Sequence, residues 1–326
     1  MLSKEELKQI LVEQREAILN KPLGIERTSL SKINKYKKLP HIIVITGLRR
    51  VGKSTFLRQI IQKYYSDNEF YYINFEDERL FNFKAENFND IYETLVELYG
   101  EKKTFFIDEI QNIKHFENFI RRFYDAGFKF FITGSNANLL SRELGTKLTG
   151  RHLDMVITPF SFLEYLQLKK VEFANEMLYK AAARGKLKQL FGNFLVSGGI
   201  PEYTIYEENE ILSRIYDDII IKDIAVRYGV SNLYEMRELF QYLISNFANR
   251  FSYTKVTKMV ELGSVNTTKN YVLFLSDTFF ISIVNKFDFS LKKQIVNEKK
   301  IYVIDNGFIP RISAKQTKDK GWLLEN

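Results

Sequence analysis

Cysteine is absent from the 326-residue sequence, and histidine occurs only three times. Without cysteine the chain can form no disulfide, no thiolate metal site and no cysteine nucleophile. The three histidines, His41, His115 and His152, are scattered along the chain and form no ligand cluster. Structural zinc sites and cysteine catalysis are therefore excluded.

Long apolar segments are also missing. No run approaches the roughly 20 apolar residues that a helix needs to span a bilayer. The opening segment, MLSKEELKQILVEQREAIL, reads as an amphipathic helix that contains acidic residues, which is not the pattern of a signal peptide. We therefore expect a cytoplasmic protein with no membrane partner.

The composition is that of a folded protein, with 45% hydrophobic and 15% aromatic residues. At about 150 residues per domain, the length predicts two or three domains.

The net charge of +8 is unevenly distributed, with +4 in residues 1–40, +1 in 41–170, −3 in 171–249 and +6 in 250–326. Basic ends on a nearly neutral body fit contacts with a phosphate backbone, although solvated lysines on an ordinary surface give the same count.

The segment HIIVITGLRRVGKSTFLRQI, residues 41–60, contains the pattern G-x-x-x-x-G-K-[ST] between an apolar strand and an apolar helix. The glycines let successive backbone N–H groups point at phosphate, and the start of the helix adds partial positive charge. Lys53 is expected to reach the β- and γ-phosphates, and Ser54 to offer its hydroxyl to Mg²⁺. The residues expected to contact the nucleotide are Gly47, Leu48, Arg49, Arg50, Val51, Gly52, Lys53, Ser54 and Thr55.

A second apolar strand, in KKTFFIDEIQNI, ends in Asp108 and Glu109. Asp108, at the strand tip, is expected to hold Mg²⁺ through its water shell. Glu109 is expected to take a proton from the attacking water as general base. A plain surface acid pair is the alternative, but the preceding strand is too apolar to be exposed, and its tip should face the edge where ligands bind.

A third strand, FKFFITGSN, ends in Ser135 and Asn136. These small polar side chains are suited to orienting water or sensing a γ-phosphate, and they could equally cap a following helix. Arg142 and Arg151 lie further along, and either could neutralise γ-phosphate charge in the same subunit or in a neighbour. Most arginines on such a segment are simply solvated.

A guanine-reading pattern also occurs, because Asn285, Lys286 and Asp288 match N-K-x-D. The tetrad lies far beyond the phosphate loop, outside any single nucleotide-binding fold. The strand expected to hold magnesium also continues as Glu-Ile-Gln, whereas GTPase switches have a glycine there. The sequence therefore predicts ATP or ADP as the nucleotide and disfavours GTP.

A phosphate loop followed by an acid doublet resembles the AAA+ and related ATPases. Further segments are similar to a prokaryotic family of ATP-binding proteins: FEDERL (75–80), IDEIQ (107–111), LTGRHLDMVITPFSFLEYL (148–166) and SGGIPEY (197–203). The resemblance implies an N-terminal AAA domain, a winged helix and, usually, a C-terminal fold related to restriction nucleases. The final GWLLEN is similar to the opening of that last fold, so we expect it to be cut off or lost here.

The resemblance also implies a role for Gly199-Ile200-Pro201. This segment is similar to a Gly-x-Pro element that, in signalling ATPases of this broad class, approaches the nucleotide from the following helices. It implies that Pro201 contacts the nucleotide. A helix-breaking turn would also explain glycine and proline together.

Alternating apolar runs predict an α/β fold, a P-loop parallel sheet with helices on both faces, followed by a helical connector and a winged-helix domain. Strands are expected at about 41–46, 70–75, 104–108, 129–133 and 153–157, and helices at about 53–65, 87–99, 115–126, 136–143 and 161–168. The expected divisions are an N-terminal lead-in at 1–40, the ATPase domain at 41–170, the connector at 171–249, the winged helix at 250–313 and a tail at 314–326.

The segment from residue 251 predicts two short helices around Gly263-Ser264, which reads as a helix-turn-helix. Polar residues at the start of the second helix would be exposed and could reach phosphates and base edges: Asn266, Thr267, Lys269 and Asn270. The strands FFISIVNKF and KKIYVID would form the wing. Its lysines Lys292, Lys293, Lys299 and Lys300 are further candidates for phosphate contacts.

Two functions remain open from the sequence. In the first, an ATPase moves a winged helix that engages double-stranded DNA or a DNA-bound partner. In the second, ATP and ADP set the conformation of a slow signalling switch that binds a protein. A homo-oligomer fits either function. Transfer of phosphate to a small substrate is a third function, which the sequence favours less.

Overall fold

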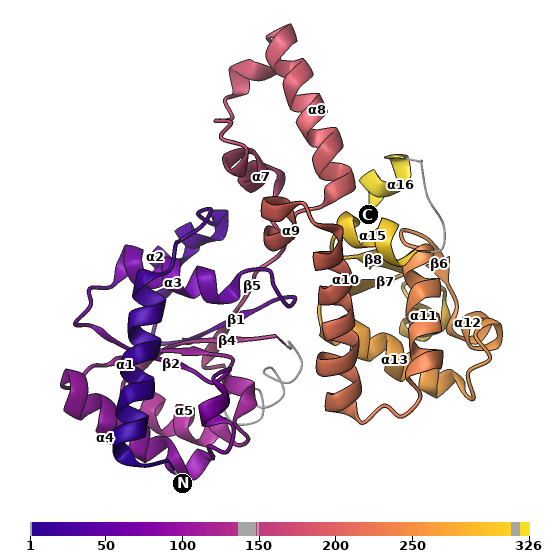
Figure 1. Ribbon diagram of the computed structural model, residues 1–326. Helices are drawn as coiled ribbons and strands as arrows, with labels where there is room; N and C mark the ends of the chain where they lie inside the picture. Colours follow the sequence, from indigo (N-terminus) through magenta and orange to yellow (C-terminus); the bar gives the residue numbers. More distant parts are fainter. Residues whose placement is uncertain (1, 136–147, 149, 314–319) are drawn as a thin grey trace. The chain divides into compact units, whose positions relative to one another are not determined.

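The computed structural model of the chain describes residues 2–135, 148, 150–313 and 320–326 (Figure 1). The chain forms two compact units. The first comprises Met1–Gly47 and Gly52–Ile157, and the second comprises Leu48–Val51 and Thr158–Asn326. Among the described residues, no helix is both long enough and apolar enough to cross a membrane.

The first unit is built on a five-stranded sheet in which every neighbouring pair is parallel, in the order β2-β3-β4-β1-β5. This confirms the predicted fold class, because parallel neighbours require crossover connections, and the connections from β1 through to β4 contain the helices α3, α4 and α5. The strands are β1 (Ile42–Thr46), β2 (Phe70–Asn74), β3 (Thr104–Asp108), β4 (Lys129–Gly134) and β5 (His152–Val156).

Pairs of phenylalanines in β3 and β4 explain why the sheet is covered on both faces. Successive side chains of a strand point to opposite faces, so each pair supplies one ring to each side. Phe105 stacks on Phe130 with ring centroids 5.3 Å apart, and Phe106 stacks on Phe131 at 4.8 Å. All four rings are fully buried. Such continuous apolar strands are typical of parallel sheets.

Helices cover the two faces of this sheet (Figure 1). The face that carries Phe105 shares a core with α1, α4 and α5. On the other face, Tyr65, at the end of α3, packs edge-on against Phe106 at 5.1 Å. The helices are α1 (Lys4–Asn20), α2 (Ile33–Tyr36), α3 (Lys53–Tyr64), α4 (Phe88–Tyr99) and α5 (Phe116–Asp125).

Helix α1 also closes one edge of the sheet. The buried amide of Gln14 donates to the carbonyl of Asn74 at 2.9 Å and accepts from the backbone N–H of the same residue at 2.9 Å. Asn74 is the last residue of β2, which is an edge strand. Gln14 therefore satisfies backbone groups that a further strand would otherwise pair with.

A half-buried lysine fixes the segment that leads into β1. The Nζ of Lys129, at the start of β4, donates to the carbonyls of Tyr36, Leu39 and His41. Burial lowers the pKa of Lys129 to about 8. Because three carbonyls converge on one amine, this side chain ties the loop after α2 to the sheet.

The second unit begins with helices, as the sequence predicted for the region after the parallel sheet. Between α10 and α11 the chain forms a π-helix, η6 (Ile219–Val226), which the apolar pattern did not indicate. The helices up to this point are α7 (Phe162–Leu168), α8 (Ala181–Ser197), α9 (Pro201–Tyr206), α10 (Asn209–Asp218) and α11 (Leu233–Ser245).

The rest of the second unit contains two further helices, α12 (Tyr253–Met259) and α13 (Val265–Asp277), and a small antiparallel sheet in the order β6-β8-β7. Ser264 caps α13 by accepting from the N–H of Thr267 at 3.0 Å. The strands are β6 (Arg250–Phe251), β7 (Ile281–Asn285) and β8 (Lys299–Val303), and the connection between β7 and β8 contains a helix, α14 (Leu291–Val296).

A buried carboxylate joins the glycine-rich turn after α8 to the turn after β8. Asp305 accepts from the N–H of Gly199 at 2.6 Å and from the N–H of Gly307 at 2.9 Å. A side chain at Gly198 would overlap Asp305, and one at Gly199 would lie 2.2 Å from the carbonyl oxygen of Phe160. Glycine is therefore required here by close packing.

The chain then forms α15 (Ile309–Ile312) and α16 (Lys320–Glu325). The side chain of Asn326 accepts from the N–H of Val303 and donates to its carbonyl, each at 2.8 Å. Leu323 is buried. The segment expected to open a nuclease-like fold thus packs against β8.

Candidate nucleotide-binding site

Apart from Arg151, the described site residues predicted in the first unit gather at the carboxyl ends of three neighbouring strands. The register pairs Thr46 of β1 with Gly134 of β4, and Ile107 of β3 with Ile132 of β4. The loops after β1, β3 and β4 therefore leave the sheet at the same edge. Ligands of open parallel sheets bind at this edge.

Lys53 is the first residue of α3, directly after Gly52. The backbone of Gly52 has a φ of 91° and that of Gly47 a φ of 148°, values that favour glycine. The Lys53 side chain is 5% exposed, and its Nζ donates to the Gly47 carbonyl at 3.3 Å. It also lies 3.8 Å from Oε1 of Glu109. A buried cation is thus held at the base of the loop.

Asp108 ends β3 and is fully buried. Burial, and next the charge of Glu109, raise the pKa of Asp108 to about 6, while hydrogen bonds from Thr133 and Ser54 oppose this shift. The hydroxyl of Thr133 donates to Oδ1 of Asp108 and accepts from the N–H of Glu109 at 3.0 Å. One buried hydroxyl therefore holds both acidic residues in place.

Glu109 adopts a left-handed backbone with a φ of 51°, unusual for a residue other than glycine. Its carboxylate accepts from the side-chain amide of Gln111, which also lies 3.5 Å from the hydroxyl of Ser135. Backbone strain of this kind collects at functional sites. Ser135 is buried, and Gln111 links it to Glu109, the predicted general base.

Arg151 is not part of this edge within its own chain. It directly precedes β5, and its carbonyl accepts from the N–H of Ile42 at the opposite ends of the strands. Its guanidinium donates to Asp125 at 2.6 Å. A role towards a γ-phosphate of the same chain is therefore wrong, because a strand separates Arg151 from the loop. Asn136 and Arg142 lie outside the described residues.

The tip of the phosphate loop, Leu48–Val51, groups with the second unit. There Arg49 forms a bidentate ion pair with the buried Asp223 of η6. Its Nε lies 2.9 Å from Oδ2, and its Nη2 lies 2.8 Å from Oδ1. Arg50 lies 3.6 Å from a carboxylate oxygen of Glu202. Both arginine charges are thus matched by carboxylates, and contact of the loop with phosphate stays a prediction.

Pro201 begins α9, where a proline at the first helical position costs no backbone hydrogen bond. The Gly-x-Pro element is therefore a helix start held by Asp305 through Gly199. The contact between Pro201 and nucleotide stays a prediction.

The residues present fit a hydrated Mg²⁺ ion. No group of three or more acidic or histidine side chains that could hold a metal occurs in the described part of the chain. Asp108 and Ser54, which hydrogen-bond to each other, supply two oxygens. They also line a cavity of about 360 Å³ together with Arg58 and Tyr72. Mg²⁺ typically takes one or two protein oxygens and completes its shell with water and phosphate.

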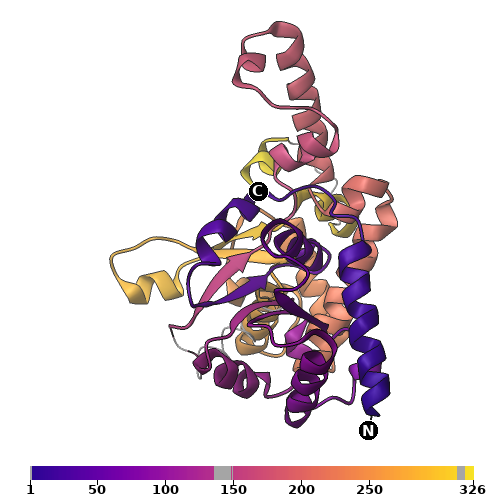
Figure 2. The same cartoon turned by 90° about the vertical axis from the view of Figure 1, so that its left-hand side faces the viewer.

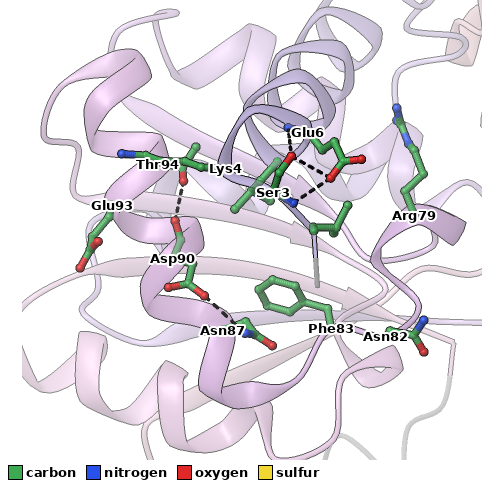
Figure 3. A pocket seen from close by; sticks show the side chains of 12 residues that line it. Ser3, Lys4, Glu6, Arg79, Asn82, Phe83, Asn87, Asp90, Glu93 and Thr94 are labelled. Atoms are coloured by element: carbon green, nitrogen blue, oxygen red, sulfur yellow. Dashed lines mark hydrogen bonds between the residues drawn. The ribbon is translucent and has the colours of Figure 1, made fainter.

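A separate cavity of about 570 Å³ lies between the start of α1 and α4 (Figure 3). Ser3 and Glu6 on one side form a capping box, in which the Ser3 N–H donates to Glu6 at 2.7 Å. On the other side Asn87 donates to Asp90 at 3.3 Å. Two of its charged side chains bond outside the lining, Lys4 to Glu97 and Arg79 to Asp77 and Glu13, and none of the lining residues belongs to the predicted nucleotide site.

Sequence reasoning missed Thr133 and Gln111. It selected Ser135 and Asn136 because they follow the strand, whereas Thr133 lies within β4. The available signal was the position of Thr133 inside the apolar run FKFFIT. A hydroxyl in such a buried strand needs a hydrogen-bond partner. No comparable signal marks Gln111 in the sequence, because its contact with Glu109 depends on the turn at Glu109.

Comparison with known proteins gives two family matches. Residues 39–166 match an AAA domain, and residues 188–319 match a domain of unknown function. An uncharacterised protein of Methanocaldococcus jannaschii is 36% identical over 299 residues, covering 89% of this chain and 66% of that protein. An uncharacterised protein of Haemophilus influenzae is 28% identical over 321 residues, covering 94% and 78%. The chain is thus similar to longer proteins of an archaeon and a bacterium.

Among solved structures, the RuvB Holliday junction branch migration motor of Thermotoga maritima aligns with 86% of this chain and 89% of its own. The sequence identity is 16% and the TM-score is 0.33.

Proposed function

We propose that the chain binds ATP with Mg²⁺ and hydrolyses it, because residues 39–166 match an AAA domain. One observation supports this most directly. The buried amine of Lys53 lies 3.8 Å from Glu109, and Asp108 and Glu109 are both held by Thr133. A cation for phosphate, a carboxylate for the metal and a carboxylate for water thus meet at one edge of the sheet.

Each of these residues then has a role in hydrolysis. The amine of Lys53 neutralises the β- and γ-phosphates, while Ser54 and Asp108 hold the metal. The metal, when bound, neutralises charge that develops on the phosphate oxygens. Once phosphate attracts Lys53 away from Glu109, that carboxylate is free to accept a proton from water. Gln111 orients the carboxylate, and Ser135 lies beside it.

Two substitutions test the proposed ATPase. Lys53→Ala should abolish tight ATP binding in calorimetry, because no other side chain at the described loop carries a buried positive charge. Glu109→Gln should keep ATP and Mg²⁺ binding but slow phosphate release about 10²–10⁴-fold, the usual contribution of a general base. Normal turnover by Glu109→Gln would mean that the base lies elsewhere.

The proposal extends to the second unit, in which residues 250–313 would act as a winged helix on double-stranded DNA. The support is the chain order of α11, β6, α12, α13, β7 and β8, with an antiparallel sheet following the helices. At the start of α13, Asn266, Lys269 and Asn270 are exposed. These side chains are free to contact phosphates and base edges.

The structure narrows the set of lysines available to DNA. Lys299 is 6% exposed, and its amine donates to the carbonyls of Gln294 and Ile295, so it stabilises α14. Lys300 pairs with Glu325. Lys299 is therefore poorly placed to contact phosphate, whereas contact by Lys300 stays a prediction, and Lys292 and Lys293 are exposed.

Salt dependence tests DNA binding. Anisotropy of a labelled duplex should give a steep log–log slope for the wild type. Replacing Lys269, Lys292 and Lys293 by Ala should flatten it by about 0.9 for each lost phosphate contact. A matched control removes three exposed lysines of the first unit, Lys32, Lys35 and Lys38, and should leave the slope unchanged.

A signalling switch that engages a protein partner is the second candidate. It is favoured by the ion pairs of Arg49 with Asp223 and of Arg50 with Glu202, because a change in the loop would strain these pairs. In this case ATP and ADP set a conformation and turnover is slow. Failure of the wild type to bind duplex even at low salt would favour this candidate and would leave the nucleotide site unaffected.

A further inference from the structure

The connection between β7 and β8 exposes large apolar side chains to an unusual degree. We call residues 286–296 the hairpin tip; Figure 2 shows the segment around α14 extending away from the small sheet. Phe287 is 74% exposed and Phe289 is 97% exposed. Three aliphatic residues are also more exposed than buried: Leu291, Ile295 and Val296. Clusters of this kind mark interaction surfaces.

The fold of the hairpin tip does not depend on these apolar side chains. Asp288 accepts from the N–H of Ser290 at 2.9 Å, and its carbonyl accepts from the amide of Gln294 at 2.6 Å. Lys299 holds the last turn of α14 through the carbonyl of Ile295 at 3.0 Å. Polar groups therefore close the turn, and the rings of Phe287 and Phe289 remain available for a partner.

The charge around the rings is positive. Lys286, Lys292 and Lys293 are exposed and form no ion pair with any residue that the structure describes. The two acidic residues nearby are engaged, Asp288 in the turn and Glu298 with Lys255 at 3.3 Å. The surface thus offers two aromatic faces and three unpaired cations, which is complementary to bases and phosphates.

We propose that the hairpin tip binds unpaired bases of DNA, with Phe287 and Phe289 stacking on bases and Lys286, Lys292 and Lys293 contacting the adjoining phosphates. The two rings lie 5.3 Å apart at an interplanar angle of 74°, an edge-to-face contact that leaves at least one face of each ring uncovered by the other. Stacking of bases on aromatic side chains beside a basic surface is the general mode of single-strand binding. The inference rests on the proposed DNA function and adds the class of DNA.

The hairpin tip would then make DNA with a single-stranded tail a better ligand than a plain duplex. Loss of one stacking ring should weaken binding to the tailed DNA on the order of 10-fold, and loss of both more. Binding to the plain duplex should change little, because its bases are already stacked on one another. This difference separates the hairpin tip from a general phosphate contact.

The test compares three labelled DNAs by anisotropy: a duplex, the same duplex with an unpaired tail, and the tail alone. F287A/F289A should lose affinity for the tail and for the tailed duplex and retain affinity for the duplex. The control is Phe81→Ala, which removes a ring of similar exposure, 85%, from the first unit, and it should bind like the wild type. Unfolding temperatures should be unchanged.

Two further variants distinguish base stacking from apolar contact in general. F287W/F289W should retain preference for the tail, because the rings are kept, whereas F287L/F289L should lose it. If the leucine variant binds the tail like the wild type, or if F287A/F289A loses binding to anionic vesicles and not to the tail, base stacking is wrong. If the wild type binds duplex without preferring the tail, this inference fails alone. If it binds neither, the proposed DNA function fails as well.

Discussion

The buried carboxylate of Asp305 should make the stability of the second unit depend on pH. Burial raises the pKa of Asp305 from 3.8 to about 6, against the opposing hydrogen bonds from Gly199 and Gly307. The native state therefore binds a proton between about pH 4 and pH 6 that the unfolded state does not bind. The free energy of unfolding therefore rises as the pH falls through about 6, and the gain due to Asp305 reaches its full size below about pH 4.

The size of the effect follows from the shift. About two pKa units correspond to about 3 kcal/mol between the two limits, and lowering the pH from 7.5 to 5 should recover about 1 to 1.5 kcal/mol of it. Asp305→Asn removes the titrating group and turns one amide hydrogen towards a backbone N–H. The variant should thus be less stable at both pH values, and its deficit should be larger at pH 5.

Urea unfolding at the two pH values measures this difference. The only tryptophan, Trp322, lies in α16 of the second unit, so its fluorescence follows that unit. Glu172→Gln, which removes an exposed charge from the same unit, is the control and should show no comparable change with pH. An equal deficit of Asp305→Asn at both pH values would refute the reasoning, because it would mean that Asp305 stays ionised in the folded protein at pH 5.

Three further substitutions test other parts of the structure. Thr133→Val should lower ATP turnover and raise the Mg²⁺ concentration needed for half-maximal rate, whereas Thr133→Ser should restore both, because only the hydroxyl orients the acid pair. Gly199→Ala should destabilise the second unit in urea unfolding by more than 1 kcal/mol, since overpacking against backbone typically costs about 1–3 kcal/mol, whereas Gly192→Ala, with open space around it, should not. Lys129→Met should destabilise the first unit by about 1–3 kcal/mol and lower its thermal midpoint by several degrees, because it leaves carbonyls without a donor. An unchanged midpoint would show that water replaces the amine.

The parallel sheet could be predicted because its signals are local and redundant. The strands β1 to β4 are largely apolar runs of about five residues bounded by charged or glycine-containing segments, and the helices α3, α4 and α5 between them have apolar periods of their own. The phosphate loop was equally clear, because Gly47, Gly52, Lys53 and Ser54 must stand at fixed positions for the backbone to surround a phosphate. The residues of the acid pair followed from the end of an apolar strand.

Other features could not be predicted, because they depend on contacts between distant residues. Nothing in the sequence around Thr133 says that its hydroxyl meets Asp108 and Glu109, since the pairing of β3 with β4 determines that contact. Lys299 looked like a surface lysine, and only the helix α14 within the hairpin explains its burial. Arg151 looked close to the phosphates because its segment follows the site in sequence, yet it enters β5 from the opposite end.

The hydrogen bonds of Gln14 have a consequence for association. An edge strand with free backbone groups can recruit the edge of another sheet, which leads to intermolecular β-structure. In this chain the end of β2 is already occupied by a side-chain amide from α1, which mimics the backbone of a neighbouring strand. Copies of the protein are therefore discouraged from joining through this edge, and α1 protects the sheet from aggregation as well as contributing to its core.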